Sequence, residues 1–279
     1  MKRTPLTLGQ LAEKAWPKFW AGTRTPAPHR SNLNKVLEGF GADRQVHRIT
    51  ASMIEDQADQ WVASGTSEKT VNRRLSVLSR MLTWAHQREW IAKVPHIQKF
   101  KEKQGRLRWQ TQEEEAEMIR LLREQGREDL SDLVACLADT GCRRSELLGL
   151  QWEDVDGSWI RLWETKGGTS RSIPCTQRVQ RILEARREQG GDGPFTEINQ
   201  AHLEYAWNKA KKAMGLADDK QFTPHCLRHG CASRLVQAGV PILTVKELLG
   251  HAKLETTLIY AHLAPRNLED AVRLLEVGR

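Results

Sequence analysis

One motif combines arginine with histidine at a spacing that could bind an oxyanion. In residues 223–229, Pro224 suits the first position of a helix, so that His225 and Arg228 lie three residues apart on one helical face. A guanidinium and an imidazole that converge at the amino end of a helix favour an oxyanion, because the guanidinium fork and the helix dipole both attract negative charge. This motif therefore predicts a phosphate site.

A second arginine motif follows a predicted helix end. Gly141 suits the left-handed residue that terminates a helix, and Arg143 and Glu146 come shortly after it. Arg143 then either points from a tight turn into a cleft or forms a surface ion pair with Glu146. His251 follows the end of a later predicted helix, and Tyr260, one of 2 tyrosines in the chain, lies on the next one. A lone tyrosine on an amphipathic helix is usually a core residue, so Tyr260 alone does not indicate catalysis.

Zinc is an alternative ligand for the first motif. Four potential ligands fall within seven residues, namely His225, Cys226, His229 and Cys231. On a helix, however, Cys226 points away from the face that the two histidines share, and no second ligand cluster occurs at zinc-finger spacing. The chain also lacks a Walker loop, a dinucleotide-binding glycine motif and a nucleophile elbow. We therefore expect no metal and no cofactor.

The composition is that of a globular protein with a basic amino-terminal third. Of the 279 residues, 39% are hydrophobic and 28% are charged, which excludes the disordered and collagen-like classes. The formal charge is +8, and residues 1–104 hold 18 Lys and Arg against 9 Asp and Glu. Such a surplus is typical of a surface that binds a polyanion, most often nucleic acid, although a solvated basic surface has the same composition.

The sequence shows no pattern for export, membrane insertion or disulfide bonding. Its apolar runs are far shorter than the roughly 20 residues that span a bilayer. The residues after Met1 do not resemble a signal peptide, and the 5 cysteines form an odd, irregularly spaced set. We expect a cytoplasmic protein without membrane association.

Apolar periodicity predicts a helical first domain, residues 1–97, followed by a polar and basic linker, residues 98–109. Residues 66–85 carry apolar side chains at helical spacing after a capping threonine or serine. Arg73 and Arg80 lie two turns apart on this helix, with Lys69 and Asn72 close by, and give it a basic side. Residues 7–21 and 31–40 also have helical patterns.

A second domain, residues 110–279, is predicted to be mainly helical with a small antiparallel sheet, which makes the fold class α+β. Thr111 and Glu114 form a capping-box pattern at its start. Two short runs, 159–166 and 170–174, flank a glycine pair and predict a β-hairpin. Helical patterns cover residues 111–122, 130–139, 176–189, 200–213, 224–238, 241–249, 254–262 and 266–276.

The order of these motifs resembles the tyrosine recombinase (phage integrase) family across nearly the whole chain. Residues 140–147, TGCRRSEL, resemble the family's first arginine box, and residues 165–174, TKGGTSRSIP, resemble its lysine-bearing hairpin. Residues 225–229, HCLRH, are similar to the His-x-x-Arg box, although Cys226 stands where many relatives carry an acidic or polar residue. Residues 249–251, LGH, and 256–262, TTLIYAH, resemble the nucleophile box. The residues after Tyr260 are most similar to integrases of temperate phages and prophages.

The resemblance implies site-specific DNA recombination through a covalent 3′-phosphotyrosyl intermediate. Tyr260 would be the nucleophile, and Arg143 and Arg228 would clamp the non-bridging phosphate oxygens, with a further hydrogen bond from His251. Proton transfer is implied for the remaining catalytic residues: Lys166 would protonate the leaving 5′-oxygen, and His225 would act as general acid and base near the tyrosine. Glu146 would have a supporting role, because it could orient an active-site arginine.

The implied partners are double-stranded DNA attachment sites, which a helical core-binding domain and the catalytic domain would grip together. DNA contacts are expected from Lys69, Asn72, Arg73 and Arg80. The family also implies a homotetramer on two duplexes, in which the tail helix packs on a neighbouring protomer or on its own. A host DNA-bending protein and an excision factor are further implied partners. The chain does not look long enough for the additional arm-type DNA-binding domain of some integrases.

Other functions share part of this pattern. A chromosome- or plasmid-dimer resolvase and a transposon recombinase would use the same chemistry. A type IB topoisomerase would also use a tyrosine and two arginines, but the His225-x-x-Arg228 box and the long tail favour recombination. A catalytically inactive DNA-binding regulator is a third class, and the presence of a residue at each catalytic position argues against it.

Overall fold

The computed structural model describes residues 6–23, 25–101, 107–163 and 170–265. Contacts divide the chain into two units, Met1–Gly105 and Arg106–Arg279. The division falls inside residues 98–109, the segment that the sequence predicts as a linker. The roles of the two domains stay predictions. Among the described residues, the mainly helical class with a small antiparallel sheet is confirmed.

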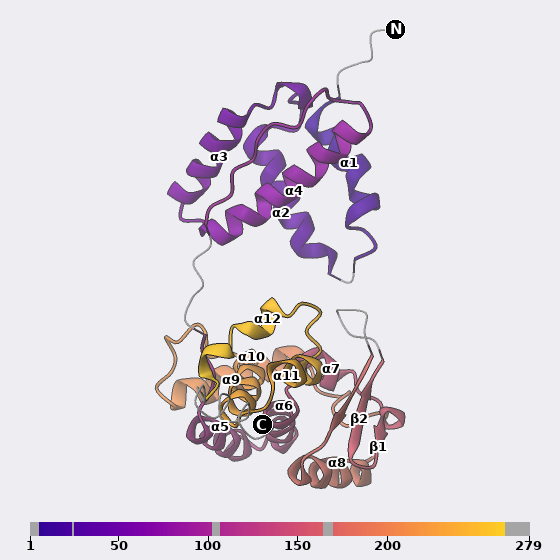
Figure 1. Ribbon diagram of the computed structural model, residues 1–279, viewed down its shortest axis with the longest axis vertical. Coiled ribbons are helices and arrows are strands. Elements are labelled where there is room, and N and C mark those ends of the chain that lie inside the picture. The colour runs from indigo at the N-terminus through magenta and orange to yellow at the C-terminus, as the bar shows by residue number, and fades with distance from the viewer. Residues whose placement is uncertain (1–5, 24, 102–106, 164–169, 266–279) are drawn as a thin grey trace, which may run out of the picture. The chain divides into compact units, whose positions relative to one another are not determined.

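Helices of the first unit surround one apolar core (Figure 1). They are α1 (Leu8–Phe19), α2 (Pro26–Phe40), the short 3-10 helix η1 (Val46–Arg48), α3 (Ala51–Ala63) and α4 (Glu68–Gln87). α4 packs against α1, α2 and α3, and its buried face carries Val71, Leu75 and Leu78 at the predicted spacing. Ser67 caps α4, because its Oγ accepts a hydrogen bond from the backbone N–H of Thr70 at 3.3 Å.

Two helices of this unit differ from the prediction. α2 begins at Pro26, five residues before the predicted start, because proline at the first helical position has a suitable fixed φ and needs no hydrogen-bond partner. α3 has no counterpart among the helices predicted from the sequence. Thr50 caps α3, and its Oγ1 accepts a hydrogen bond from the backbone N–H of Met53 at 3.3 Å. Only Ile54, Ala58 and Trp61 are buried, so its apolar stripe is narrow.

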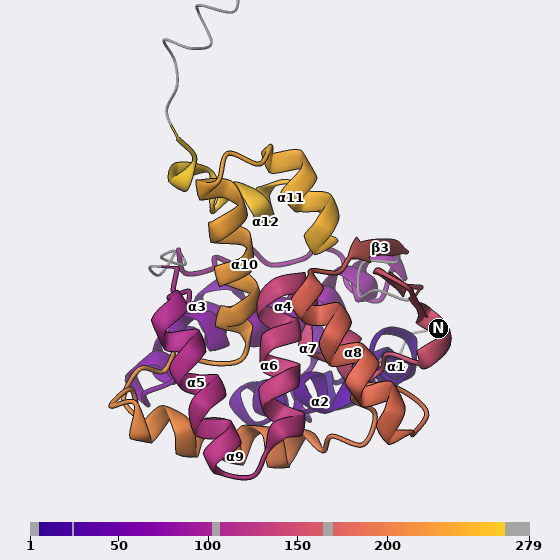
Figure 2. The ribbon, with the colours of Figure 1, turned by 90° about the horizontal axis from the view of Figure 1, so that it is seen from below.

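In the second unit, helices form the main core and a small sheet lies beside it. Its elements are α5 (Gln112–Glu124), α6 (Glu128–Thr140), α7 (Arg144–Leu148), η2 (Trp152–Asp154), β1 (Val155–Asp156), β2 (Trp159–Leu162), β3 (Arg171–Pro174), α8 (Gln177–Gln189), α9 (Gln200–Ala213), α10 (His225–Gln237), α11 (Ile242–Leu249), α12 (Glu255–Leu258) and η3 (Ala261–Leu263). α5, α6 and α8 lie side by side in Figure 2, and α10 packs on α6. The capping box at the start of α5 is confirmed.

The sheet has the order β1-β2-β3, and both pairs are antiparallel. Ile160 of β2 faces Ile173 of β3, and both are fully buried against the helices. The strands of the predicted hairpin are therefore confirmed, whereas β1 was not predicted because its two residues are too short for an alternating pattern. Lys166 lies outside the described residues, as does the predicted helix 266–276.

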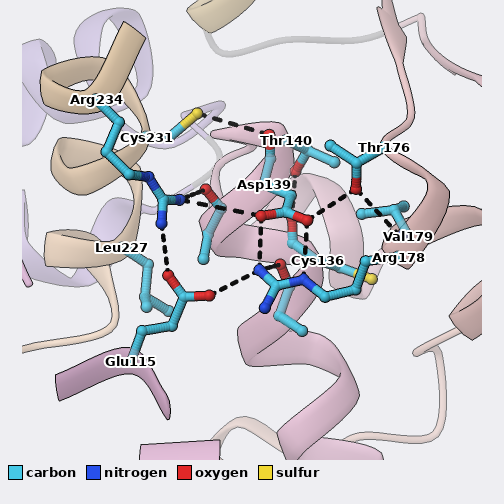
Figure 3. A network of polar contacts seen from close by, with 12 residues as sticks. Glu115, Cys136, Asp139, Thr140, Thr176, Arg178, Val179, Leu227, Cys231 and Arg234 are labelled. Atoms are coloured by element: carbon cyan, nitrogen blue, oxygen red, sulfur yellow. Dashed lines mark hydrogen bonds and ion pairs between the residues drawn. The ribbon is translucent and has the colours of Figure 1, made fainter. Parts of the chain in front are cut away.

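A network of ion pairs ties four helices of the second unit together (Figure 3). Glu115 of α5 is buried and accepts hydrogen bonds from Arg178 of α8 at 2.7 Å and from Arg234 of α10 at 2.9 Å. Arg178 also pairs with Asp139 of α6 at 2.6 Å. Thr176, just before α8, donates to Asp139 at 2.8 Å. Loss of one member would leave buried charges unpaired, so the network holds α10 in a fixed position.

The cysteines are buried, and the described helices do not resemble membrane spans. All five cysteines are buried free thiols, and burial raises the pKa of each. Among the described residues, the helices are too short or too polar to cross a bilayer.

Candidate active site

Two arginines are anchored to the same turn at the end of α11. Arg228 of α10 is only 3% exposed, and its guanidinium donates to the carbonyls of Gly141 and Leu249, each at 2.6 Å. Arg143, which precedes α7, donates to the carbonyl of Gly250 at 3.1 Å. The two guanidiniums are therefore brought together from elements more than eighty residues apart in sequence.

Glu146 fixes the orientation of Arg143. Its carboxylate accepts the backbone N–H of Arg143 at 2.8 Å and the Nη1 of the same residue, also at 2.8 Å. Arg171 of β3 binds the two carboxylate oxygens at 2.7 and 3.1 Å. Burial alone would raise the pKa of Glu146, but these hydrogen bonds outweigh it and lower the pKa. Arg143 thus lines a pocket, as the first interpretation expected. It also pairs with Glu146, but not at the surface, because the Glu146 side chain is only 6% exposed.

That pocket has a volume of about 1000 Å³ and a basic lining. Its lining includes Arg143, Arg144, Lys211, Lys220, His225 and Arg228. Arg228 lies at its buried end, where burial and the charge of Arg143 lower the pKa of Arg228 to about 10. The guanidinium still carries its charge at neutral pH. Two such charges held close together favour an anion such as a phosphate.

His225 and His251 occupy helix boundaries near these arginines. His225 is the first residue of α10 and is exposed to solvent, three positions before Arg228 as predicted. His251 follows α11, and its Nδ1 lies 2.9 Å from the Oγ1 of Thr257. Burial and the charge of Arg228 lower the pKa of His251 to about 4, so its ring is neutral at pH 7. A neutral imidazole with one nitrogen engaged keeps the other for a hydrogen bond to a ligand.

Tyr260 is buried, and its hydroxyl is bound to a histidine that the prediction omits. The residue is 1% exposed and lies between α12 and η3. The single helix predicted for residues 254–262 is therefore wrong, since two short helices occupy this range. Its Oη is 2.5 Å from the Nδ1 of His229 on α10. Burial raises the pKa of Tyr260 to about 12.

The structure brings some of the predicted catalytic residues together and places the other described ones in the same unit. Arg143, Glu146 and Arg228 converge, and α10 and the end of α11 hold the remaining described ones, His225, His251 and Tyr260, in the same unit. The prediction missed Arg171 and His229. The position of His229 next to Arg228 was a sequence signal for its role. Arg171 has no such signal, because its position in a predicted strand does not indicate a partner.

In the first unit, three of the four predicted DNA contacts are exposed on α4. They are Lys69, Arg73 and Arg80, and the guanidinium of Arg80 stacks over the ring of Phe19 at 4.5 Å. Asn72 requires a correction, because it is 5% exposed and points inward. Its side-chain amide donates to the carbonyl of Phe100 and accepts from the N–H of the same residue, both at 2.9 Å. This amide anchors the chain after α4 and is not available to DNA.

No group of three or more metal-ligating side chains occurs within the part of the chain that the structure describes. The His225 and His229 rings pack edge to face with centroids 4.6 Å apart, while Cys226 is buried in the core. The zinc alternative therefore has no geometric support.

The motifs, the fold and the converging arginines can be compared with known proteins. The model of the phage integrase family matches residues 108–267. The chain belongs to the phage integrase family. The resemblance inferred from the motifs is thus confirmed, and the match includes the positions of the converging arginines and of Tyr260.

Sequence relatives include phage and cellular members. The integrase of Salmonella phage P22 is 30% identical over 72% of this chain, which covers 56% of that protein. The integrase of Escherichia phage P2 is 27% identical over 88% of this chain and 71% of that protein. A tyrosine recombinase of Thermosipho africanus (strain TCF52B) is 29% identical over 88% of this chain and 91% of that protein. The chain thus spans little more than half the length of the P22 relative.

Solved structures share the fold. The Tn1549 transposon integrase, in complex with a circular intermediate DNA, has a TM-score of 0.79 at 20% identity over 98% of this chain and 99% of that one. A lambda integrase tetramer bound to a Holliday junction has a TM-score of 0.75 at 18% identity over 91% of this chain and 78% of that one. These likenesses show a common fold.

Proposed function

We propose that this chain is a site-specific DNA recombinase that cuts and rejoins strands through a 3′-phosphotyrosyl intermediate. The observation that carries the proposal is the convergence of Arg143 and Arg228 on one basic pocket, in the same unit as Tyr260. Membership of the phage integrase family supports it. Integration of phage or other mobile-element DNA is the use that the P22 and P2 relatives favour.

The reaction needs a nucleophile, a charge clamp and an acid. The Oη of Tyr260 bonds to phosphorus and gives its proton to His225, while the bond from phosphorus to the 5′-oxygen breaks. Arg143 and Arg228 bind the two non-bridging oxygens, on which charge builds in the transition state. Lys166 gives its proton to the 5′-oxygen, which leaves as a free hydroxyl. Removal of one preorganised donor of this type costs on the order of 10²- to 10³-fold in rate.

The remaining site residues have supporting parts in the proposal. His225, exposed at the mouth of the pocket, acts as general acid and base, a function that contributes roughly 10²- to 10⁴-fold. His251 donates a hydrogen bond to the phosphate, and Glu146 keeps Arg143 in place. Because the phosphotyrosyl bond conserves the energy for rejoining, the proposed chemistry needs neither ATP nor a metal ion.

Assembly on DNA is part of the same proposal. The exposed Lys69, Arg73 and Arg80 of α4 bind the phosphates of double-stranded attachment sites, and four protomers act on two duplexes. The lambda integrase tetramer on a Holliday junction, which shares this fold, supports that assembly. A host DNA-bending protein and an excision factor complete the proposed partners.

Covalent capture tests the chemistry. The wild-type chain, Tyr260→Phe and Tyr205→Phe are each incubated with a library of nicked duplexes of randomised core sequence, in EDTA and without ATP. We expect an adduct on a denaturing gel from the wild type and from Tyr205→Phe, and none from Tyr260→Phe. The captured DNA is then sequenced to identify the site.

Three outcomes contradict the proposal. An adduct that persists in Tyr260→Phe and disappears in Tyr205→Phe moves the nucleophile to Tyr205. Sequence-specific DNA binding without any adduct from the wild type favours a catalytically inactive regulator. If the protein forms the adduct and relaxes supercoiled plasmid but does not join two sites, it is a topoisomerase.

A further inference from the structure

The hydroxyl of Tyr260 is held on the side of α10 that faces a small apolar cluster. The Oη lies 2.5 Å from the Nδ1 of His229, and the two ring centroids are 5.9 Å apart. Tyr260 packs with Ala232, Val236 and Leu249, which are buried in the same cluster. With 1% of its surface exposed, the side chain is enclosed together with its reactive atom.

The basic pocket does not reach this hydroxyl. Arg143, His225 and Arg228 line the pocket, but Tyr260 and His229 are absent from its lining among the described residues. Arg228 is on α10 directly before His229, and its charge acts on Tyr260. Arg228 faces the pocket, and His229 binds the tyrosine. A phosphate bound in the pocket therefore does not meet the Oη until Tyr260 moves.

His229 is poorly suited to take the proton of Tyr260 in this arrangement. Burial, assisted by His225 and the charge of Arg228, lowers the pKa of His229 to about 4, whereas burial raises the pKa of Tyr260 to about 12. Proton transfer from the phenol to the imidazole is thus unfavourable. The contact keeps a neutral phenol in place and does not generate a phenolate.

We propose that His229 is a positioning residue that retains the Tyr260 hydroxyl in a buried resting place, so that cleavage begins only after this hydrogen bond is broken. The inference rests on the proposed function, because it takes Tyr260 to be the nucleophile. Movement of Tyr260 into the pocket exchanges His229 for the phosphate as the partner of its hydroxyl. His229 therefore restrains the reaction, in contrast to His225 and His251, which promote it.

Nitration of tyrosine measures the restraint without DNA. The chain has 2 tyrosines, and Tyr205 is 71% exposed and serves as an internal reference. Full-length protein is treated with tetranitromethane, and the nitration of each tyrosine is quantified by mass spectrometry. We expect His229→Leu to raise the nitration of Tyr260 relative to Tyr205 about fivefold, within the range that loss of one hydrogen bond supplies.

Two matched variants separate the hydrogen bond from general loosening. His229→Asn places an amide oxygen near the position of Nδ1, so it is expected to restore most of the protection of Tyr260. His262→Leu changes an exposed histidine two residues after Tyr260 and is expected to leave the nitration ratio unchanged. Thermal unfolding of each variant verifies that it is folded. If His229→Leu does not fold, His229→Gln takes its place, because its longer amide does not match the position of Nδ1.

Single-turnover cleavage of a captured nicked duplex gives the second readout. At saturating DNA, His229→Leu is expected to form adduct about fivefold faster than the wild type, with unchanged Kd for the duplex. Unchanged Tyr260 nitration in the folded variant, or slower cleavage, overturns the proposal. Absence of an adduct from every variant contradicts the proposed recombinase function instead, and the nitration ratio still decides whether His229 restrains Tyr260.

Discussion

The carboxylate of Glu146 joins two arginines that come from different parts of the second unit. Its side chain is 6% exposed and that of Arg171 is 8% exposed, so this ion pair is shielded from water. Arg171 also donates to the carbonyl of Leu248 at 3.0 Å, at the end of α11. At the residue scale, the position of Arg143 thus depends on a carboxylate that is itself held by β3, the second strand of the hairpin.

Glu146→Gln is expected to destabilise the protein by about 3 kcal/mol at pH 7, because it leaves the buried Arg171 without its counter-charge. The lowered pKa of Glu146 means that its contribution is fully present above the unfolded pKa, near 4.3, and is lost as the pH falls through the folded value. Urea unfolding between pH 7 and pH 3 should therefore show the wild type and the variant converging in acid.

Glu117→Gln is the control for this titration, since Glu117 forms a surface pair with Arg120. Its effect on the free energy of unfolding should be small at each pH, because an exposed ion pair contributes little to stability. A difference between the wild type and Glu146→Gln that is constant with pH would mean that the carboxylate does not provide the stability.

Helices, at the element scale, are held in place by the Glu115 network. Glu115→Ala leaves Arg178 and Arg234 without a shared carboxylate. Because these side chains are 40% and 33% exposed, we expect a loss of about 1.5 to 3 kcal/mol in the free energy of unfolding. Glu117→Ala, on the solvent side of the same helix, is expected to have a much smaller effect, because an exposed ion pair contributes little to stability. Urea denaturation compares the two, and equal effects would show that the network adds no stability.

The turn after α11 is a second element that sets the site. Gly250 has φ of +66°, and a Cβ there would lie 2.6 Å from the Nη1 of Arg171. Gly239 has a similar φ of +81° but open space around the Cβ position. Both Gly→Ala changes should cost about 1 kcal/mol from backbone strain. Only Gly250→Ala should also slow adduct formation, because its Cβ displaces Arg171. Equal rates for both variants would show that the position of Arg171 does not affect catalysis.

Elements with a strong local sequence pattern could be predicted from the sequence. The apolar spacing of residues 66–85 and the Thr111 capping box predicted α4 and the start of α5, and Gly141 ends α6 with a φ of +62° as expected. Two helices could not be predicted: α3, because its buried stripe is narrow, and α7, because it has only five residues. The contacts of Arg171 and Asn72 could not be predicted, because each bonds to a segment distant in sequence.

At the scale of the whole molecule, the excess positive charge belongs to the first third of the chain. Arg73→Ala is expected to weaken DNA binding at low salt and to reduce the slope of log K against log salt by about 0.9, the effect of one phosphate contact. Arg181→Ala removes an exposed arginine of α8 that does not line the pocket, and should change neither quantity. Fluorescence anisotropy over a salt series measures both, and an unchanged slope for Arg73→Ala would place DNA elsewhere.

The burial of every native thiol gives the folded protein a surface without reactive sulfur. Burial raises the thiol pKa to about 11 or 12 for Cys142, Cys175, Cys226 and Cys231, and it also raises the pKa of Cys136, so little thiolate exists at pH 8. A maleimide dye should thus label only a cysteine that is introduced on purpose. One label on each unit, at Glu68→Cys and Arg181→Cys, would follow their separation by energy transfer while the wild-type cysteines stay in place.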